Sequence, residues 1–436
     1  MPCRELTYTG PAMWPELEDW LAGRQDPDQG VEDKVRAILA KVKETGDAAL
    51  AEYTRSFDCP EFTQAMIRVP AREIEAAAKA VDPGDMDILR QAADNIREYH
   101  HAQKRESWWR TRPDGTILGQ LVRPVDRVGL YVPGGQGGET PLISSLLMNA
   151  IPAQVAGVED IAIVSPPRKD GTLNPLILAA AHMLDISKVY RVGSAWAVAA
   201  LAYGTQSIAR VDVIAGPGNI FVATAKRLLI GQVGIDMIAG PSEILILADG
   251  SSVCRPDWIA ADMLSQAEHD AQASALLVTS DPDLGAKVKA ELTRQVADLP
   301  RSEMAEQSLK DWGAVITVDS LDTGIGLLNL VAPEHLELLV EDPWAMVGKV
   351  RHAGAIFMGG NSPEPVGDYF AGPNHVLPTM GTARFSSALG VDDFCKASSL
   401  IAASPAFIAN HADAIARLAR LEELEAHARS VESRKQ

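Results

Sequence analysis

Glu334 and His335 are adjacent in the chain and are the pair of residues whose types are best suited to proton transfer. An imidazole titrates near neutral pH, and a carboxylate beside it can orient or accept a proton. The pair follows an apolar stretch, residues 327–331. Adjacent Glu and His residues also occur on solvated helix faces, so the dipeptide alone leaves a catalytic and a surface interpretation open.

Gln266, His269 and Asp368 have side chains that could bind a metal ion. Gln266 and His269 lie on a predicted helix, residues 257–270, and their spacing puts both side chains on one face. Neutral imidazole is a common zinc ligand and a carboxylate is a frequent companion, whereas a glutamine amide is unusual. A histidine on a helix is also often only solvated, so spacing alone does not decide between the two.

Asp368 and His375 belong to a segment that is rich in glycine and proline, Gly367-Asp368-Tyr369-Phe370-Ala371-Gly372-Pro373-Asn374-His375. These residue types predict a loop, and loops often carry functional side chains. The alternative is a structural turn in which Asp368 and Asn374 accept hydrogen bonds from backbone donors.

Three glycine-containing turns are expected next to strands: Tyr131-Val132-Pro133-Gly134-Gly135, Gly216-Pro217-Gly218-Asn219 and Gly240-Pro241-Ser242-Glu243. The backbone amides of the first two could approach a phosphate. Neither fits the dinucleotide fingerprint or the P-loop, so they indicate tight strand-to-helix turns and only weakly a nucleotide. Ser242 does not lie in a G-x-S-x-G motif, which argues against a nucleophile.

The composition is that of a globular protein with two or more domains, because 436 residues exceed one ordinary core. No run approaches the roughly 18 consecutive apolar residues of a membrane span. The formal net charge of -18 repels phosphate backbones. We therefore expect neither a membrane nor a nucleic acid as a partner.

The four cysteines are scattered without a Cys-x-x-Cys pair, which argues against a disulfide framework, an iron-sulfur cluster or a cysteine-rich zinc site. Residues 1–6 lack the basic region and apolar core of a secretory signal. We expect a cytoplasmic location with reduced thiols.

The hydrophobic pattern predicts the elements that must position these residues. Apolar residues recur at helical spacing in residues 31–53, 71–80 and 86–103. From residue 127, short β-branched runs alternate with amphipathic stretches, which predicts parallel strands joined by helices. The expected strands are residues 128–132, 161–165, 189–192, 211–214, 244–248, 275–279, 314–318 and 355–358. Helices are expected at residues 282–296, 342–351 and 404–432.

We therefore predict an α/β protein with two Rossmann-like, incompletely doubly wound domains, an N-terminal helical layer and a C-terminal helical arm. Residues 1–126 form the helical segment, which is expected to pack with the second α/β unit. Residues 127–238 form the first Rossmann-like domain, and residues 239–380 form the second, with the candidate metal ligands and the Glu334-His335 pair. Residues 381–436 form an arm that could pack on a partner subunit.

Six longer motifs extend over the chain: Tyr131-Val132-Pro133-Gly134-Gly135, Leu147-Met148-Asn149-Ala150-Ile151-Pro152-Ala153, Gly216-Pro217-Gly218-Asn219, Ala239-Gly240-Pro241-Ser242-Glu243, Ser265-Gln266-Ala267-Glu268-His269 and Asn374-His375-Val376-Leu377-Pro378-Thr379. Together they resemble the histidinol dehydrogenase family, and the resemblance covers nearly the whole chain. It implies a zinc-dependent enzyme of histidine biosynthesis. Such an enzyme oxidises L-histidinol through the aldehyde to L-histidine, with two NAD molecules used in sequence.

The resemblance also implies roles for individual residues. One zinc ion per subunit would be bound by Gln266, His269, Asp368 and His427. His335 would be the base for the alcohol step, and Glu334 would activate water for the aldehyde step. The substrate contacts would be Ser242, Gln266, His269, His335, Asp368, Glu422 and His427. Tyr131 and Asn219 match positions that contact NAD.

The family forms a homodimer with intertwined subunits, in which the C-terminal arm bearing Glu422 and His427 completes the partner's site. This chain departs from the family at Trp196, where the family has a glutamine that contacts NAD, and we expect the indole to stack on a cofactor ring. The loop at residues 136–143 is also longer than usual. These departures leave open a paralogue that oxidises another primary alcohol, such as a sulfopropanediol. A third alternative is a non-catalytic zinc-stabilised scaffold or binding protein, against which the Glu334-His335 pair argues.

Overall fold

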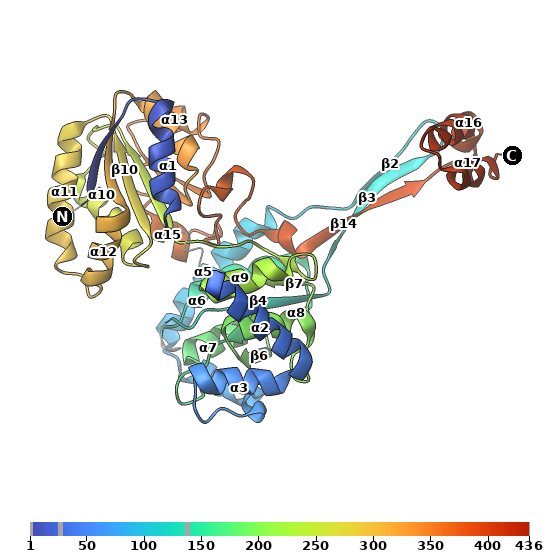
Figure 1. Ribbon diagram of the computed structural model, residues 1–436, viewed down its shortest axis with the longest axis horizontal. Coiled ribbons are helices and arrows are strands. Elements are labelled where there is room, and N and C mark those ends of the chain that lie inside the picture. Colours follow the sequence, from blue (N-terminus) through green and yellow to red (C-terminus); the bar gives the residue numbers. More distant parts are fainter. Residues whose placement is uncertain (1–2, 25–28, 136–139, 436) are drawn as a thin grey trace.

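The computed structural model of the protein describes residues 3–24, 29–135 and 140–435. Two α/β bodies lie side by side, and an arm extends away from them and ends in two helices (Figure 1). Each body is built on a parallel sheet with helices on both faces. The predicted α/β class is therefore confirmed.

A six-stranded parallel sheet with the order β1-β11-β10-β9-β12-β13 forms the core of one body. Ile244 and Ile246 of β9 pack toward α10 and α11, whereas Leu245 and Leu247 pack toward α1 and α13. Such near-continuous apolar strands are typical of parallel sheets that are covered on both faces. The strands are β1 (Arg4–Tyr8), β9 (Glu243–Ala248), β10 (Ser274–Thr279), β11 (Gly313–Val318), β12 (His335–Leu339) and β13 (Ala355–Met358). The helices are α1 (Trp14–Ala22), α10 (Pro256–Ala267), α11 (Pro282–Val296), α12 (Ser302–Trp312), α13 (Leu321–Val331), α14 (Pro343–Val347) and α15 (Glu364–Tyr369).

A five-stranded parallel sheet with the order β6-β5-β4-β7-β8 forms the core of the other body. The neighbours β4 and β7 send the chain to opposite faces, because α6 follows β4 on one face and α9 follows β7 on the other. Such a switch in direction opens a crevice at the carboxyl ends of the two strands. The strands are β4 (Arg127–Tyr131), β5 (Asp160–Ser165), β6 (Lys188–Arg191), β7 (Val213–Ala215) and β8 (Gly234–Ile235). The helices are α2 (Gln29–Thr45), α3 (Asp47–Phe57), α4 (Ala71–Ala80), α5 (Pro83–His101), α6 (Ile143–Ala156), α7 (Pro175–Met183), α8 (Ser194–Tyr203) and α9 (Ile220–Leu229).

The N-terminal segment is divided between the two bodies, which corrects the expectation that residues 1–126 pack with the second α/β unit. Strand β1 pairs with β11 and α1 covers the six-stranded sheet. Helices α2 and α3 instead pack on one face of the five-stranded sheet, and α4 and α5 pack on the other. The helices divide between the bodies because each one buries its apolar face in the core of a single body.

The arm contains an antiparallel sheet with the order β14-β3-β2, which the sequence pattern did not predict. Its strands are β2 (Trp108–Thr111), β3 (Ile117–Pro124) and β14 (Cys395–Ala402). Residues 108–124 are therefore a hairpin rather than part of a helical layer. The expected helix at residues 404–432 is two helices, α16 (Pro405–Leu421) and α17 (Glu425–Glu432), and Glu423 between them has a φ of 61°. Short 3-10 turns lie at Pro11–Met13, Gln64–Met66, Thr382–Arg384 and Val391–Phe394.

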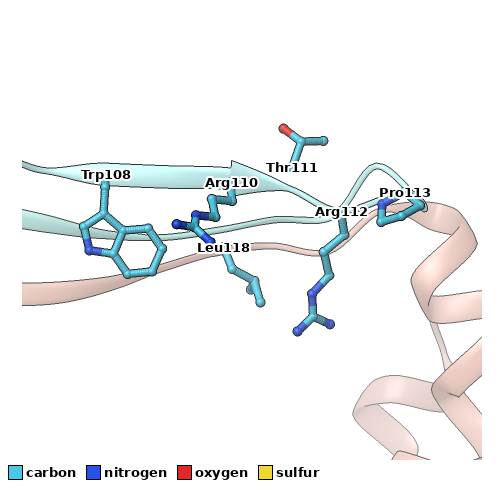
Figure 2. Close-up of a pocket in the computed structure, with 6 residues that line it drawn as sticks. All are labelled: Trp108, Arg110, Thr111, Arg112, Pro113 and Leu118. Atoms are coloured by element: carbon cyan, nitrogen blue, oxygen red, sulfur yellow. The ribbon is translucent and has the colours of Figure 1, made fainter.

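A hollow of about 710 Å³ lies on the arm beside the β2–β3 hairpin (Figure 2). Its lining residues are Trp108, Arg110, Thr111, Arg112, Pro113 and Leu118. None of them is a residue to which the sequence assigned a site role, so this hollow does not mark the predicted chemistry. Within the described ranges, no helix is both long and apolar enough to cross a membrane.

Candidate active site

Glu334 and His335 lie at the amino end of β12, where the turn after helix α13 leads into the strand. Helix α13 ends at Val331, and Ala332 adopts the left-handed conformation with a φ of 52°. His335 is the first residue of β12 and pairs in register with Ile244 of β9. Residues alternate across a strand, so His335 and Glu337 face one side of the sheet and Leu336 and Leu338 the other. The turn thus sets which face of the sheet receives the imidazole, which is buried.

The backbone and the carboxylate of Glu243 contact the pair. The Glu243 N–H donates to Glu334 Oε2 at 2.9 Å, and the Glu334 N–H donates to Glu243 Oε2 at 3.3 Å. His335 Nδ1 lies 3.0 Å from the Glu243 carbonyl oxygen. A carbonyl oxygen only accepts, so Nδ1 carries the hydrogen and Nε2 is left as the ring atom that can receive a proton.

A buried ion pair stabilises Glu243 in turn. Arg24, at the end of α1, pairs with the Glu243 carboxylate and donates to Ser274 Oγ at 2.8 Å. Both charged side chains are buried. The N-terminal helix is therefore connected through Glu243 to the Glu334-His335 pair, which lies far along the sequence.

The two groups have shifted pKa values. Burial raises the pKa of Glu334 to about 8, against the opposing effect of His335. Burial disfavours the charged imidazole, but the Glu334 and Asp368 carboxylates outweigh it and raise the pKa of His335 to about 10. His335 Nε2 lies 3.7 Å from Asp368 Oδ1, and Nδ1 lies 3.7 Å from Glu334 Oε2. In this chain alone the pair therefore favours a protonated imidazole.

The candidate metal ligands come together from α10 and α15. Helix α10 ends at Ala267, so His269 lies in the turn that follows rather than on the helix, which corrects the predicted range 257–270. The backbone N–H of His269 donates to the Gln266 carbonyl, which keeps both residues near one another. Asp368 lies on the short helix α15 rather than in a loop, because the turn of residues 364–369 forms before the glycine and proline at 372–373.

These side chains fit a divalent metal ion such as zinc. Ligand atoms of His269, Glu364 and Asp368 all lie within 4.8 Å of one another. Gln266 is 1% exposed, and among the described residues neither its Oε1 nor its Nε2 has a hydrogen-bond partner. A buried amide without partners is costly, and a cation together with a polar ligand would satisfy it.

Glu364 is the member of this group that the sequence did not single out. It lies between Pro363 and Pro365, and neither its type nor its spacing distinguished it. Its Oε2 accepts from Ser265 Oγ at 2.8 Å, and its backbone N–H donates to Glu337 Oε1 at 3.0 Å. Burial raises the pKa of Glu364 and that of Glu337, and it raises the pKa of nearby Asp262 to about 6. A cluster of buried carboxyl groups therefore lies behind the candidate ligands.

Ser242 lies at the amino end of β9, and His375 lies near Asp368. Ser242 directly precedes β9 and Glu243, and its carbonyl accepts from the Ser274 N–H at 3.0 Å. Burial lowers the pKa of the His375 imidazole, and the nearby Asp368 carboxylate opposes this effect more weakly. Asn374, the residue before His375, donates to the Met148 carbonyl at 2.6 Å, so the segment that follows α15 is attached to α6 of the other body.

Glu422 and His427 are not brought to this group within the chain. Both are exposed at the far end of the arm, on or next to α16 and α17 (Figure 1). The arm carries them away from β12, so a site that includes them would need the arm of another copy.

The residues expected at a cofactor lie on or near the five-stranded sheet. Tyr131 ends β4 and is 4% exposed, and its hydroxyl accepts from the Ser194 N–H at 3.1 Å. Asn219 follows β7 and caps α9, where its Oδ1 accepts from the N–H groups of Phe221 and Val222. The two residues therefore flank the point at which the strand order reverses. Residues 136–139 of the loop that we expected to be long lie outside the described residues.

The ring of Trp196 is occupied by stacking on aromatic side chains of this chain rather than being free for a cofactor. It is 4% exposed and stacks with Tyr53 and Phe57 of α3, at centroid distances of 5.5 Å and 5.6 Å. It also belongs to the apolar cluster that joins α3 and α8. This corrects the cofactor contact predicted for Trp196, because the indole is used in packing.

Comparisons with known proteins agree with this arrangement. The family model described as histidinol dehydrogenase matches residues 22–435. A histidinol dehydrogenase of Nitratidesulfovibrio vulgaris is 66% identical and covers 100% of this chain and 99% of its own length. One from Oleidesulfovibrio alaskensis is 64% identical, with 100% of each chain covered.

A solved structure is also similar over its whole length. The crystal structure of histidinol dehydrogenase from Elizabethkingia anophelis has a TM-score of 0.91 and 36% identity, and the match covers 98% of this chain and 97% of that one. The resemblance noted in the sequence motifs is confirmed. The chain belongs to the histidinol dehydrogenase family.

Proposed function

We propose that this protein is an NAD-dependent dehydrogenase that oxidises L-histidinol through L-histidinaldehyde to L-histidine, the last reaction of histidine biosynthesis. The family membership supports the reaction. The observation that supports the site is the buried Glu334-His335 pair, because His335 Nε2 has no hydrogen-bond partner among the described residues and lies 3.7 Å from Asp368 Oδ1. This pair supplies two groups for proton transfer beside a place where a substrate can be held.

Gln266, His269 and Asp368 of this chain would hold zinc, with His427 as the remaining ligand. When bound there, zinc would orient the imidazole and amine of the substrate and offset the Asp368 charge, which favours the neutral His335. Ser242 would contact the substrate next to Glu243. Tyr131 and Asn219 would contact NAD at the carboxyl edge of the five-stranded sheet.

In the alcohol step, His335 Nε2 would take the hydroxyl proton as the carbinol hydride leaves for the nicotinamide. The hydrogen bond from Nδ1 to the Glu243 carbonyl supports this role, because it leaves Nε2 as the basic atom. The product of this step is the aldehyde, and its retention between the steps would avoid release of a reactive intermediate.

In the aldehyde step, Glu334 would activate the water that adds to the carbonyl, and a second hydride would leave for a second NAD. The raised pKa of Glu334, caused mainly by burial, supports a carboxyl group that can gain and lose a proton near neutral pH. Glu334 and His335 would thus serve different steps although they are neighbours.

A second copy of the chain would complete the site. Glu422 and His427 lie on an arm that extends away from their own body (Figure 1). A homodimer that exchanges arms would place Glu422 as the partner of the substrate ammonium and His427 as a zinc ligand. A cytoplasmic location stays a prediction from the sequence.

Steady-state NADH formation with L-histidinol tests the proposed reaction. Two NADH should form per L-histidinol consumed, and a yield of one would rule out the two-step oxidation. A paralogue acting on another primary alcohol would turn over L-histidinol only at very high concentration. The full-length identity to histidinol dehydrogenases does not favour that alternative.

A further inference from the structure

Gly216, the first residue of the Gly216-Asn219 turn, is held at both of its backbone polar groups by one buried ion pair. Its N–H donates to Asp236 Oδ2 at 2.8 Å, and its carbonyl accepts from Lys226 Nζ at 2.9 Å. Lys226 Nζ also lies 2.5 Å from Asp236 Oδ1, so the two side chains and Gly216 form a closed set of contacts. The side chains are 2% and 0% exposed.

The location of the pair explains how it reaches the turn. Lys226 lies on α9, and helical side chains lean toward the N-terminus of their helix, so the ammonium reaches back to Gly216 in the turn before the helix. Asp236 follows β8, which pairs with β7 in register. The two residues therefore approach Gly216 from a helix and from a neighbouring strand.

The turn leaves no freedom for another residue at position 216. Gly216 has a φ of 116°, and a Cβ there would lie 2.1 Å from the Tyr131 carbonyl oxygen. The turn is thus pressed against Tyr131 on one side and leads into Asn219, the cap of α9, on the other. These are the two residues expected at NAD.

A buried ion pair is not by itself a sign of stability, because the cost of removing two charges from water can exceed their attraction. Here the charges also satisfy the two backbone groups of one glycine, so their most direct effect is on the shape of the turn. Preorganised backbone groups lower the cost of binding a ligand, because no ordering is needed when it arrives.

We propose that Lys226 and Asp236 are positioning residues for NAD, which fix the Gly216-Asn219 turn against Tyr131 in the shape that binds the cofactor. The inference rests on the proposed cofactor edge of the five-stranded sheet. Neither residue touches the cofactor in this account, and neither contacts the candidate metal ligands or the Glu334-His335 pair.

The test measures NAD binding and catalysis separately in Lys226→Met, Lys226→Arg and the double variant Lys226→Met/Asp236→Asn. In Lys226→Met, the KM for NAD and the Kd for NADH should rise about tenfold or more, while kcat at saturating NAD stays within about threefold. Lys226→Arg should recover part of the loss, because it keeps a charged donor. The KM for L-histidinol and the zinc content should not change.

Arg227→Gln provides the matched control, because Arg227 is the next residue on α9 and forms an exposed ion pair with Glu32. It should leave NADH binding unchanged. If Lys226→Met does not fold, the double variant removes both buried charges and should show the same weakened NADH binding. Unchanged NADH affinity in a folded Lys226→Met or double variant would overturn the proposal.

Hydrogen exchange of the unmodified protein, with and without NADH, separates this inference from the proposed function and needs no variant. NADH should slow exchange in the peptide that contains residues 216–222. Protection there with unchanged affinity in the variants would reject the positioning role alone. Protection confined to the six-stranded body would reject the proposed cofactor edge and the positioning role with it.

Discussion

The two sheets carry their candidate functional residues at opposite ends of their strands. In the five-stranded sheet, Tyr131 and Gly216 lie at the carboxyl ends of the neighbours β4 and β7, where open α/β sheets usually bind ligands. In the six-stranded sheet, Glu334 and His335 lie at the amino end of β12. Each of these edges is supported by a buried ion pair, Lys226–Asp236 in one and Arg24–Glu243 in the other.

The ion pairs differ in what they support. Lys226 and Asp236 hold the backbone of a glycine, and they fix the shape of a turn. Arg24 holds Glu243, whose backbone N–H and carbonyl contact the titratable side chains of Glu334 and His335. Near these side chains, Gln266 and His335 Nε2 lack hydrogen-bond partners in the part of the chain that the structure describes. The five-stranded edge therefore provides a turn with a fixed backbone shape. The six-stranded edge provides titratable and polar side chains whose unpartnered atoms could bind a ligand.

The largest expected effect is that of His335→Asn. The variant keeps a polar side chain of similar size but removes the base, and general bases contribute about 10²- to 10⁴-fold. We expect the first NADH from L-histidinol to form at least about 100-fold more slowly, as measured by stopped-flow absorbance, with zinc content retained. A loss of only a few-fold would mean that the six-stranded edge does not provide the base.

Removal of Arg24 tests the support of the six-stranded edge. Arg24→Met leaves the Glu243 carboxylate buried without its partner, and breaking a buried pair costs about 3–5 kcal/mol. Urea unfolding should show a loss of that size, and Arg24→Met/Glu243→Gln should recover part of it. Lys349→Met removes an exposed ion pair with Asp322 and should cost no more than about 1 kcal/mol. If Arg24→Met and Lys349→Met lowered the free energy of unfolding equally, the Arg24–Glu243 pair would not support the six-stranded edge.

His269→Ala tests whether the unsatisfied groups of the six-stranded edge bind zinc. Changes to residues that only orient metal ligands typically cost about 10- to 100-fold in metal affinity, so loss of a ligand should cost at least about tenfold. Elemental analysis after dialysis should find much less than one zinc per subunit. Glu268→Ala, a change at the neighbouring position, serves as the control. Full zinc content in His269→Ala would refute the ligand set.

Trp196→Phe should have the smallest effect on catalysis. The indole packs on Tyr53 and Phe57 rather than facing a ligand, so the affinity for NADH should change by less than about twofold. Fluorescence or calorimetric titration measures this directly. A tenfold weaker affinity would restore Trp196 as a cofactor contact and would show that the five-stranded edge binds through more than its backbone.

Most strands of the two bodies could be predicted because their apolar, β-branched runs are buried on both faces. Strands β2, β3 and β14 could not, because the arm leaves most of their residues exposed or half-buried and no apolar alternation marks them. Strands β1 and β8 were missed too, because β1 lies at a sheet edge with mostly exposed residues and β8 has only two residues. Strand β12 was missed for a different reason. His335 and Glu337 occupy positions on the side of the strand that faces the candidate ligands, and their charges interrupt the apolar pattern.

The candidate site was predicted in part. The motifs indicated Gln266, His269, Asp368 and the Glu334-His335 pair, which the fold brings into one region. Glu364 could not be identified, because only the packing of α15 against α10 brings it to His269. The ion pair between Arg24 and Glu243 could not be predicted either, since nothing in the sequence relates these two residues. Trp196 was misjudged because a ring's exposure depends on the helix packed against it.

The central claim is that Glu334 and His335 serve different steps, and the NADH yield of Glu334→Gln tests it most directly. With L-histidinol and excess NAD in a single turnover, this variant should form the first NADH at close to the normal rate. The second should form about 100-fold more slowly, because the amide cannot activate water. Two separate phases of one NADH each are the predicted result. Equal slowing of both phases would contradict the division of roles.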